Sequence, residues 1–212
     1  MEDKIKHGTT TVGLVCKDGV ILAADRRATA GHLVANKKTE KVQQISDYMA
    51  ITTAGLVSDA QLFTRVIKAQ LALLRIRKNG KEPTVEEASN LLSSMSYTNI
   101  RRPSMVPGIV GFLLGGHDKK GHHLYEIGCD GSAEMADDYR ADGSGSVFAL
   151  GVLEALYVPD MTLEEGVKVA VRAISAALQR DIYTGNGIDV VTITASGVTK
   201  VLSKEVNAVL KA

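Results

Sequence analysis

The order in which strand-like and helical segments follow one another restricts the fold of this chain more than any other feature. Runs rich in β-branched residues cover 9–16, 20–25, 42–45 and 48–54, and a second group covers 109–114, 124–129 and 132–136. A final pair, 188–194 and 198–202, flanks a Ser196-Gly197 turn. Helical segments separate these groups, so we expect an α+β fold in which helices cover the outer faces of two sheets.

Two capping boxes mark where helices begin. Glu87 follows Thr84, and Glu165 follows Thr162, at the spacing in which the side chain of each residue satisfies the other's backbone N–H. Apolar residues at helical spacing follow both boxes and also occupy 58–78 and 148–157. The pattern predicts two pairs of helices. A chain of 212 residues fits a single domain around one continuous arrangement of layers.

Composition argues against several classes of function. Lys and Arg total 25 against 24 Asp and Glu, so the basic surplus of a nucleic-acid-binding protein is missing. No apolar run approaches the roughly 18 residues of a membrane span. Residues 1–8 are charged and lack the apolar core of a secretory signal, and Cys16 and Cys129 are too sparse for a disulfide framework. We expect a cytoplasmic protein with no nucleic-acid or membrane partner.

The segment Gly8-Thr9-Thr10-Thr11-Val12-Gly13 holds the first candidate chemistry. A threonine exposed as an N-terminus carries both a nucleophilic hydroxyl and a base, its own α-amine. Because an α-amine has a pKa of about 7.7–8.0, roughly 10–20% of it is neutral at pH 7. On this motif alone, however, threonines that fill a strand are the simpler interpretation.

Asp25 and Lys41 are the second candidate. Asp25 ends the predicted strand 20–25, and Lys41 immediately precedes the predicted strand 42–45. The two side chains could form an ion pair beside the strand that begins at Thr9. Taken singly, each is better explained as a solvated surface charge, since surface ion pairs contribute little.

Several segments together carry a resemblance that extends over nearly the whole chain. They are G-T-T-T-V-G at 8–13, A-A-D-R-R-A-T at 23–29, the Lys41 segment, T-A-G-L-V-S-D-A-Q at 53–61, G-S-G-S at 143–146 and R-D-I-Y-T-G at 180–185. In this order the segments resemble a proteasome β subunit of the archaeal type, within the N-terminal nucleophile hydrolases. The resemblance implies a four-layer αββα sandwich, which agrees with the order of strands and helices.

The resemblance also implies the activity, that of a threonine-type endopeptidase. Residues 1–8 would be a propeptide that Thr9 removes by attacking the Gly8 carbonyl, which leaves 9–212 as the catalytic domain. Asp25 and Lys41 would be the charged pair that holds and activates Thr9.

Further site residues are implied in the same way. Ser144, Asp181 and Thr184 would supply hydrogen bonds near the Thr9 α-amine, and Thr184 departs from the serine usual in the family. Gly55 would direct its backbone N–H at the oxyanion. The residues implied to bind substrate are Ala28, Thr29, Thr39, Gln43, Thr53, Val57 and Gln61. No cofactor and no metal are implied.

Assembly follows from the resemblance as well. It implies heptameric rings of β subunits stacked between rings of α subunits, and an ATPase regulatory particle that acts on unfolded proteins through the α rings. A noncatalytic ring subunit, the bacterial two-ring relative and a binding module for small amides are the alternatives. The intact Thr9, Asp25 and Lys41 favour the peptidase. The sequence leaves the cleavage preference open.

Overall fold

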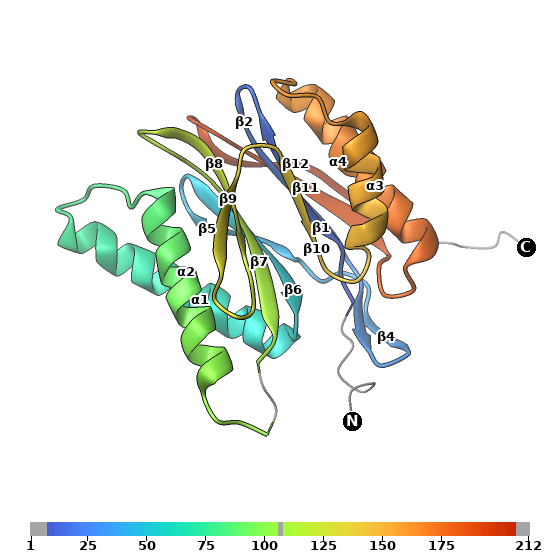
Figure 1. Ribbon diagram of the computed structural model, residues 1–212, viewed down its shortest axis with the longest axis horizontal. Coiled ribbons are helices and arrows are strands. Elements are labelled where there is room, and N and C mark those ends of the chain that lie inside the picture. The colour runs from blue at the N-terminus through green and yellow to red at the C-terminus, as the bar shows by residue number, and fades with distance from the viewer. Residues whose placement is uncertain (1–7, 106–107, 207–212) are drawn as a thin grey trace, which may run out of the picture.

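The computed structural model describes residues 8–105 and 108–206, and most of its strands form two antiparallel sheets (Figure 1). The predicted propeptide lies outside these residues except for Gly8. One sheet has the order β10-β1-β2-β11-β12. Its strands are β1 (Thr11–Cys16), β2 (Gly19–Asp25), β10 (Tyr139–Asp142), β11 (Gly187–Thr194) and β12 (Gly197–Glu205).

The other sheet has the order β5-β6-β7-β8-β9. Its strands are β5 (Val42–Ser46), β6 (Met49–Gly55), β7 (Val110–Asp118), β8 (Gly121–Ile127) and β9 (Ala133–Ala136). A separate small hairpin pairs β3 (Ala28–Ala30) with β4 (Leu33–Asn36). This hairpin projects beyond the sheets (Figure 1).

The helices are α1 (Val57–Arg77), α2 (Val85–Arg101), α3 (Ser146–Leu156) and α4 (Leu163–Arg180). Both predicted capping boxes are formed. The side chains of Thr84 and Thr162 each accept a hydrogen bond from the backbone N–H of the glutamate three residues later, and the threonine backbone N–H donates to the carboxylate of that glutamate. Figure 1 shows α1 and α2 over one sheet and α3 and α4 over the other. The predicted pairs of helices are therefore confirmed.

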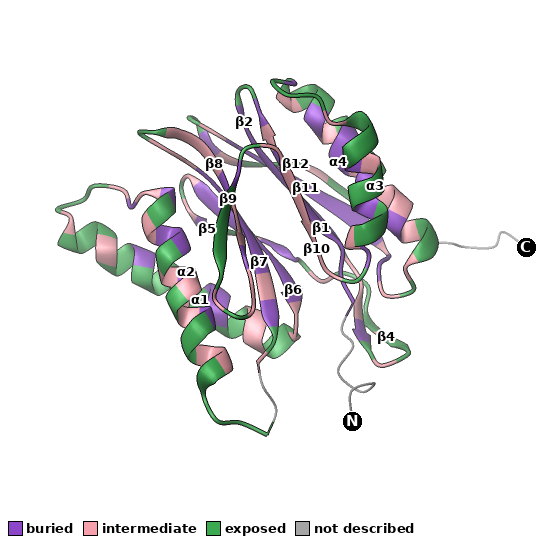
Figure 2. Cartoon of the chain, viewed as in Figure 1, coloured by how far each residue is buried: buried purple, intermediate pink, exposed green. Residues whose placement is uncertain are grey.

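Strand alternation explains how two sheets can pack between these helices. In β2, Ile21 and Ala23 pack toward α3 and α4, whereas Val20 and Leu22 enter the core between the two sheets. The central strands are accordingly coloured as buried along most of their length in Figure 2, and every residue of β2 is buried. The four layers are helices, sheet, sheet and helices, the αββα arrangement that the sequence predicted.

The structure contains three short strands that the sequence pattern did not reveal. β3, β4 and β10 were not predicted, since none is long enough to display an alternating pattern. The turn between β7 and β8 is short, because β7 continues to Asp118 and β8 begins at Gly121. Pairing of His117 with His122 across the two strands extends the hairpin.

The site lies where four strands meet at one end of the sandwich. β1 and β5 begin there, and β2 and β6 end there. β10 pairs with β1 and thereby brings the loop that follows Asp142 next to Thr9. Among the described residues, no helix combines the length and apolar character needed to cross a membrane.

Candidate active site

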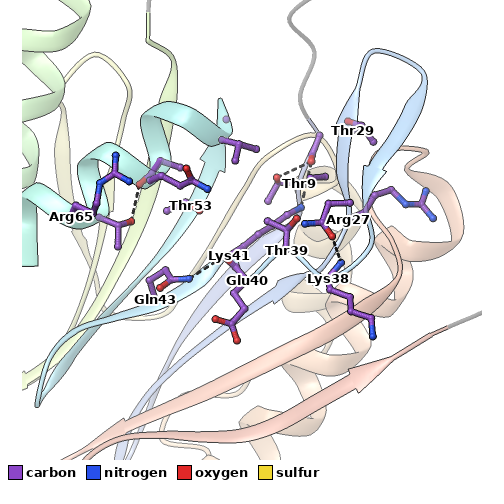
Figure 3. A pocket seen from close by; sticks show the side chains of 18 of the residues that line it. Thr9, Arg27, Thr29, Lys38, Thr39, Glu40, Lys41, Gln43, Thr53 and Arg65 are labelled. Carbon is purple, nitrogen blue, oxygen red and sulfur yellow. Dashed lines mark hydrogen bonds between the residues drawn. The ribbon is translucent and has the colours of Figure 1, made fainter.

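A pocket of about 500 Å³ opens beside Thr9 at this end of the molecule (Figure 3). Strand ends form one part of its wall, the β3–β4 hairpin a second, and the first turns of α1 a third. The described residues that line it are Gly8, Thr9, Arg27, Ala28, Thr29, Asn36, Lys38, Thr39, Glu40, Lys41, Gln43, Thr53, Gly55, Val57, Ala60, Gln61, Thr64, Arg65 and Lys68. All the residues implied to bind substrate are among them.

Asp25 lies at the end of β2, completely buried behind Thr9. Its Oδ1 accepts hydrogen bonds from the backbone N–H of Thr10 at 3.0 Å and from Lys41 Nζ at 2.7 Å. Its Oδ2 accepts the backbone N–H groups of Arg27 at 3.0 Å and Gly185 at 2.9 Å. A buried carboxylate is tolerated only when it is paired and hydrogen-bonded in this way. Asp25 thus fixes the start of β1 and the lysine together.

Lys41 projects toward Thr9 from the residue just before β5. Its side chain is only 5% exposed. Burial lowers the pKa of Lys41 below its usual value, and the charge of Asp25 opposes that change. The ammonium also lies 3.5 Å from the carbonyl oxygen of Gly8. Lys41 therefore holds a positive charge between a fixed carboxylate and the Gly8–Thr9 peptide bond.

Thr9 is buried, and its hydroxyl is directed back at the preceding peptide bond. Oγ1 donates to the carbonyl oxygen of Gly8 at 2.8 Å. The backbone N–H of Thr9 donates to Ser144 Oγ at 3.3 Å. The carbonyl oxygen of Gly8 consequently contacts both the hydroxyl of Thr9 and the ammonium of Lys41. This arrangement can attack and polarise that carbonyl at the same time.

A chain of hydroxyls and one carboxylate supports the nitrogen side of Thr9. Ser144 Oγ donates to Asp181 Oδ2 at 2.6 Å, and Thr184 Oγ1 donates to the same oxygen at 2.5 Å. The Thr184 hydroxyl also lies 2.6 Å from Thr10 Oγ1. Since the Thr184 proton is directed at Asp181, Thr10 is the donor in that contact. Ser144 contacts Thr9 directly, whereas Thr184 contacts Thr10 and Asp181.

Gly55 ends β6 and borders the pocket together with Thr9. Its φ of +134° is one that side-chain-bearing residues rarely adopt. A Cβ at this position would also lie 2.2 Å from the carbonyl oxygen of Ile109. A side chain at this position would therefore require the backbone at Ile109 to shift.

Sequence reasoning missed several residues of the site. Thr10 was not singled out, although it bonds both Asp25 and Thr184. Arg65 and Lys68 were missed as well, although both line the pocket from α1. A signal was available, since positions 57, 61, 65 and 68 share one face of a helix. The described residues contain no cluster of three or more His, Cys, Asp or Glu that could hold a metal ion.

Comparisons with known proteins agree on one family. The profile of the family described as "Proteasome subunit" matches residues 5–193. A protein of Archaeoglobus profundus named "Proteasome subunit beta" is 46% identical over 210 residues, which covers 99% of this chain and 95% of that protein. Proteins of the same name from Ferroglobus placidus and Methanobrevibacter ruminantium are 45% and 42% identical, covering 100% and 97% of this chain and 98% and 95% of their own lengths.

Proposed function

Because this chain belongs to the proteasome subunit family, as a β subunit of the core particle, we propose that it is the precursor of a threonine-type endopeptidase with Thr9 as nucleophile. A peptidase activity is general to the family. The observation that carries the finer assignment is the convergence of the Thr9 hydroxyl and the Lys41 ammonium on the carbonyl of Gly8. A subunit that only completed the ring would need neither group there.

Self-cleavage is the first reaction that this geometry supports. Thr9 Oγ attacks the carbonyl carbon of Gly8, and Lys41 stabilises the negative charge that develops on its oxygen. The C–N bond then breaks as the hydroxyl proton passes to the nitrogen, which transfers the acyl group from nitrogen to oxygen and frees the α-amine of Thr9. Water hydrolyses the resulting ester, so residues 1–8 leave with a new carboxyl group and Thr9 regains its hydroxyl.

The mature reaction uses the same atoms on a different carbonyl. The α-amine accepts the hydroxyl proton, directly or through a water, while Thr9 Oγ attacks the substrate. Lys41 favours the developing alkoxide, and Asp25 holds the lysine in place. The amine returns the proton to the leaving group, and water then hydrolyses the acyl ester left on Thr9, which releases the second product and restores the hydroxyl. Ser144 and Asp181 orient that amine through the contact already made to the Thr9 nitrogen.

Substrate would bind in the pocket as an extended peptide. Thr29 and Gly55 offer backbone groups on either side of it, in the manner of an added strand. Ala28, Thr39, Gln43, Thr53, Val57 and Gln61 would surround the side chain that precedes the scissile bond. Membership of the family implies assembly with other subunits into a core particle. Heptameric rings, α-subunit caps and an ATPase that delivers unfolded proteins are our proposals for its partners.

The intact mass of the β subunit tests this proposal directly. The chain is co-expressed with an archaeal proteasome α subunit, and assembled particles are measured with and without an electrophilic peptide probe. We expect the loss of residues 1–8 and the addition of one probe molecule, located on Thr9 by peptide mapping. Assembled particles that keep residues 1–8 and take up no probe would instead identify a noncatalytic ring subunit.

A glycine substitution tests the self-cleavage step separately. A Cβ at Gly8 would lie 1.6 Å from Tyr183 Cβ and 2.8 Å from Ser144 Oγ, so Gly8→Ala must shift the Gly8 backbone or the Tyr183 and Ser144 segments that hold the site around Thr9. We expect cleavage to slow by about 10²-fold, because small misplacement of reacting atoms is costly. Gly151→Ala in α3 is the matched control, since its Cβ meets nothing within 4 Å. Equal processing of both variants would argue against attack by Thr9.

A further inference from the structure

The pocket beside Thr9 is rich in positive charge. Among the described residues that line it, five are lysine or arginine, and Glu40 is the single carboxylate. The cations are Arg27, Lys38, Lys41, Arg65 and Lys68. Whether this charge is available to a substrate depends on the partner that each group already has.

Two of the cations are neutralised. Lys41 pairs with Asp25 at 2.7 Å and belongs to the machinery around Thr9. Lys38 pairs with Glu205 at 2.8 Å at the outer edge of the pocket. Neither offers an unpaired charge to an incoming side chain.

The carboxylate of Glu40 is also occupied, by a residue outside the pocket. Lys200 of β12 lies 2.9 Å from Glu40 Oε1. The hydrogen bond from Lys200, together with its charge, lowers the pKa of Glu40. Figure 3 shows the Glu40 side chain extending away from Thr9. This residue therefore does not neutralise the remaining cations of the pocket.

Arg27, Arg65 and Lys68 have no carboxylate partner among the described residues. Arg27 donates to two neutral acceptors, the side-chain oxygen of Asn186 at 2.8 Å and the carbonyl of Ile182 at 2.7 Å. Arg65 and Lys68 follow one another on the pocket face of α1. In Figure 3, Arg65 lies on the α1 side of the pocket, across from Arg27. The helix wall thus presents two unpaired cations.

The uncharged part of the lining offers little to a large apolar side chain. The largest aliphatic residue among the described lining residues is Val57. Gln43, Thr53 and Gln61 contribute polar groups instead. An apolar substrate side chain placed here would take water from the amides and cations without replacing their hydrogen bonds, which is unfavourable.

We propose that this pocket selects an acidic side chain, such as that of glutamate, on the residue that precedes the scissile bond. The inference rests on the proposed function, because it assigns the substrate class of that same site. A carboxylate can accept paired hydrogen bonds from the guanidinium of Arg65, and Lys68 adds a second positive charge.

Fluorogenic peptides that differ only in this residue test the inference on processed, assembled particles. Glutamate, glutamine and leucine are compared, since glutamine keeps the shape of glutamate without its charge. We expect kcat/KM for the glutamate peptide to exceed that for the glutamine peptide by about tenfold, the effect of one hydrogen bond to a charged group. The leucine peptide should be cleaved less efficiently than the glutamate peptide.

Substitutions on α1 assign the preference to its source. Arg65→Gln combined with Lys68→Gln should reduce the glutamate-to-glutamine ratio to about one, and Arg65→Glu should bring it below one. Arg77→Gln is the matched control, because Arg77 is exposed on the same helix but does not line the pocket. The control should keep the ratio of the unmodified chain.

The other possible results distinguish failure of the acidic preference from failure of the proposed peptidase function. Equal cleavage of the glutamate and glutamine peptides, or faster cleavage of the leucine peptide, would overturn the acidic preference while leaving the peptidase intact. A preference that persists in the double variant would remove α1 as its source and overturn the inference as argued. If no peptide is cleaved and the probe leaves Thr9 unlabelled, the proposed function itself fails.

Discussion

The two ends of the pocket hold positive charge in opposite ways. At the inner end, Lys41 is buried and bonded to Asp25, whose oxygens accept four hydrogen bonds in all. At the outer end, Arg65 and Lys68 are exposed and have no ion-pair partner among the described residues. The inner charge is fixed by the fold, whereas the outer charges are free to bind an incoming group.

This contrast separates chemistry from selection. A preorganised charge acts strongly on a reacting atom, because no dipoles or solvent must rearrange during the reaction. An exposed charge is screened and mobile, so it discriminates between ligands by smaller amounts. Substitutions at the inner end should therefore have much larger effects than substitutions at the outer end, and the predictions below test that order.

Lys41→Ala should have the largest effect. Removal of the cation beside Thr9 should lower kcat/KM of correctly processed particles by about 10³-fold, the scale seen when an electrostatic stabiliser is deleted. Because the buried Asp25 would lose its partner, the free energy of unfolding should also fall by about 3–5 kcal/mol. Peptide hydrolysis and thermal unfolding measure the two effects. Processing in trans or expression from residue 9 supplies the mature form.

A second substitution at Lys41 separates chemistry from stability. Lys41→Arg keeps a cation next to Asp25, but its planar guanidinium cannot reproduce the point charge beside Thr9. We expect activity to stay low while most of the unfolding free energy returns. Lys168→Ala, which removes an exposed cation paired with Glu164 on α4, should change neither quantity measurably. Near-normal turnover in the Lys41→Ala particles would remove Lys41 from the chemistry.

Thr184→Val should have an intermediate effect. Valine matches the shape of threonine but lacks the hydroxyl that bonds Asp181 and Thr10, so the buried hydroxyl of Thr10 loses its acceptor. We expect a loss of about 1–3 kcal/mol in stability and about tenfold in kcat, measured on processed particles. Thr184→Ser should retain both. If serine and valine behave alike, the hydroxyl chain has no role in positioning Thr9.

How much of the fold the sequence could predict depends on the length and regularity of each element. Long elements with a regular pattern were predicted well, such as α2 with its capping box and β2 with both faces buried. β3 and β10 are too short to show a period, and each is held only by its pairing with another strand. Their existence depends on contacts between distant residues, which a local pattern does not contain.

In the candidate site, the sequence predicted residues that stand in recognisable segments but not the contacts between distant segments. Thr9, Asp25 and Lys41 stand in recognisable segments, and the structure brings them together. The contact between Thr10 and Thr184 joins residues far apart in the chain, and no sequence feature of either segment predicts it. Which cations remain unpaired could not be predicted at all. That property depends on Glu40 being held by Lys200 from the other sheet.

Salt should have the smallest effect and should act only on the outer charges. The Debye length falls from about 10 Å at 0.1 M salt to about 3 Å at 1 M, which screens exposed charges far more than buried pairs. Between these concentrations we expect the glutamate-to-glutamine ratio of kcat/KM to fall about threefold. Both peptides are hydrolysed by the same particles, so any change in assembly cancels in the ratio. The variant that lacks the cations of Arg65 and Lys68 should show no salt dependence of this ratio. An equal salt dependence in that variant would place the selecting charge elsewhere in the pocket, with Arg27 as the next group to substitute.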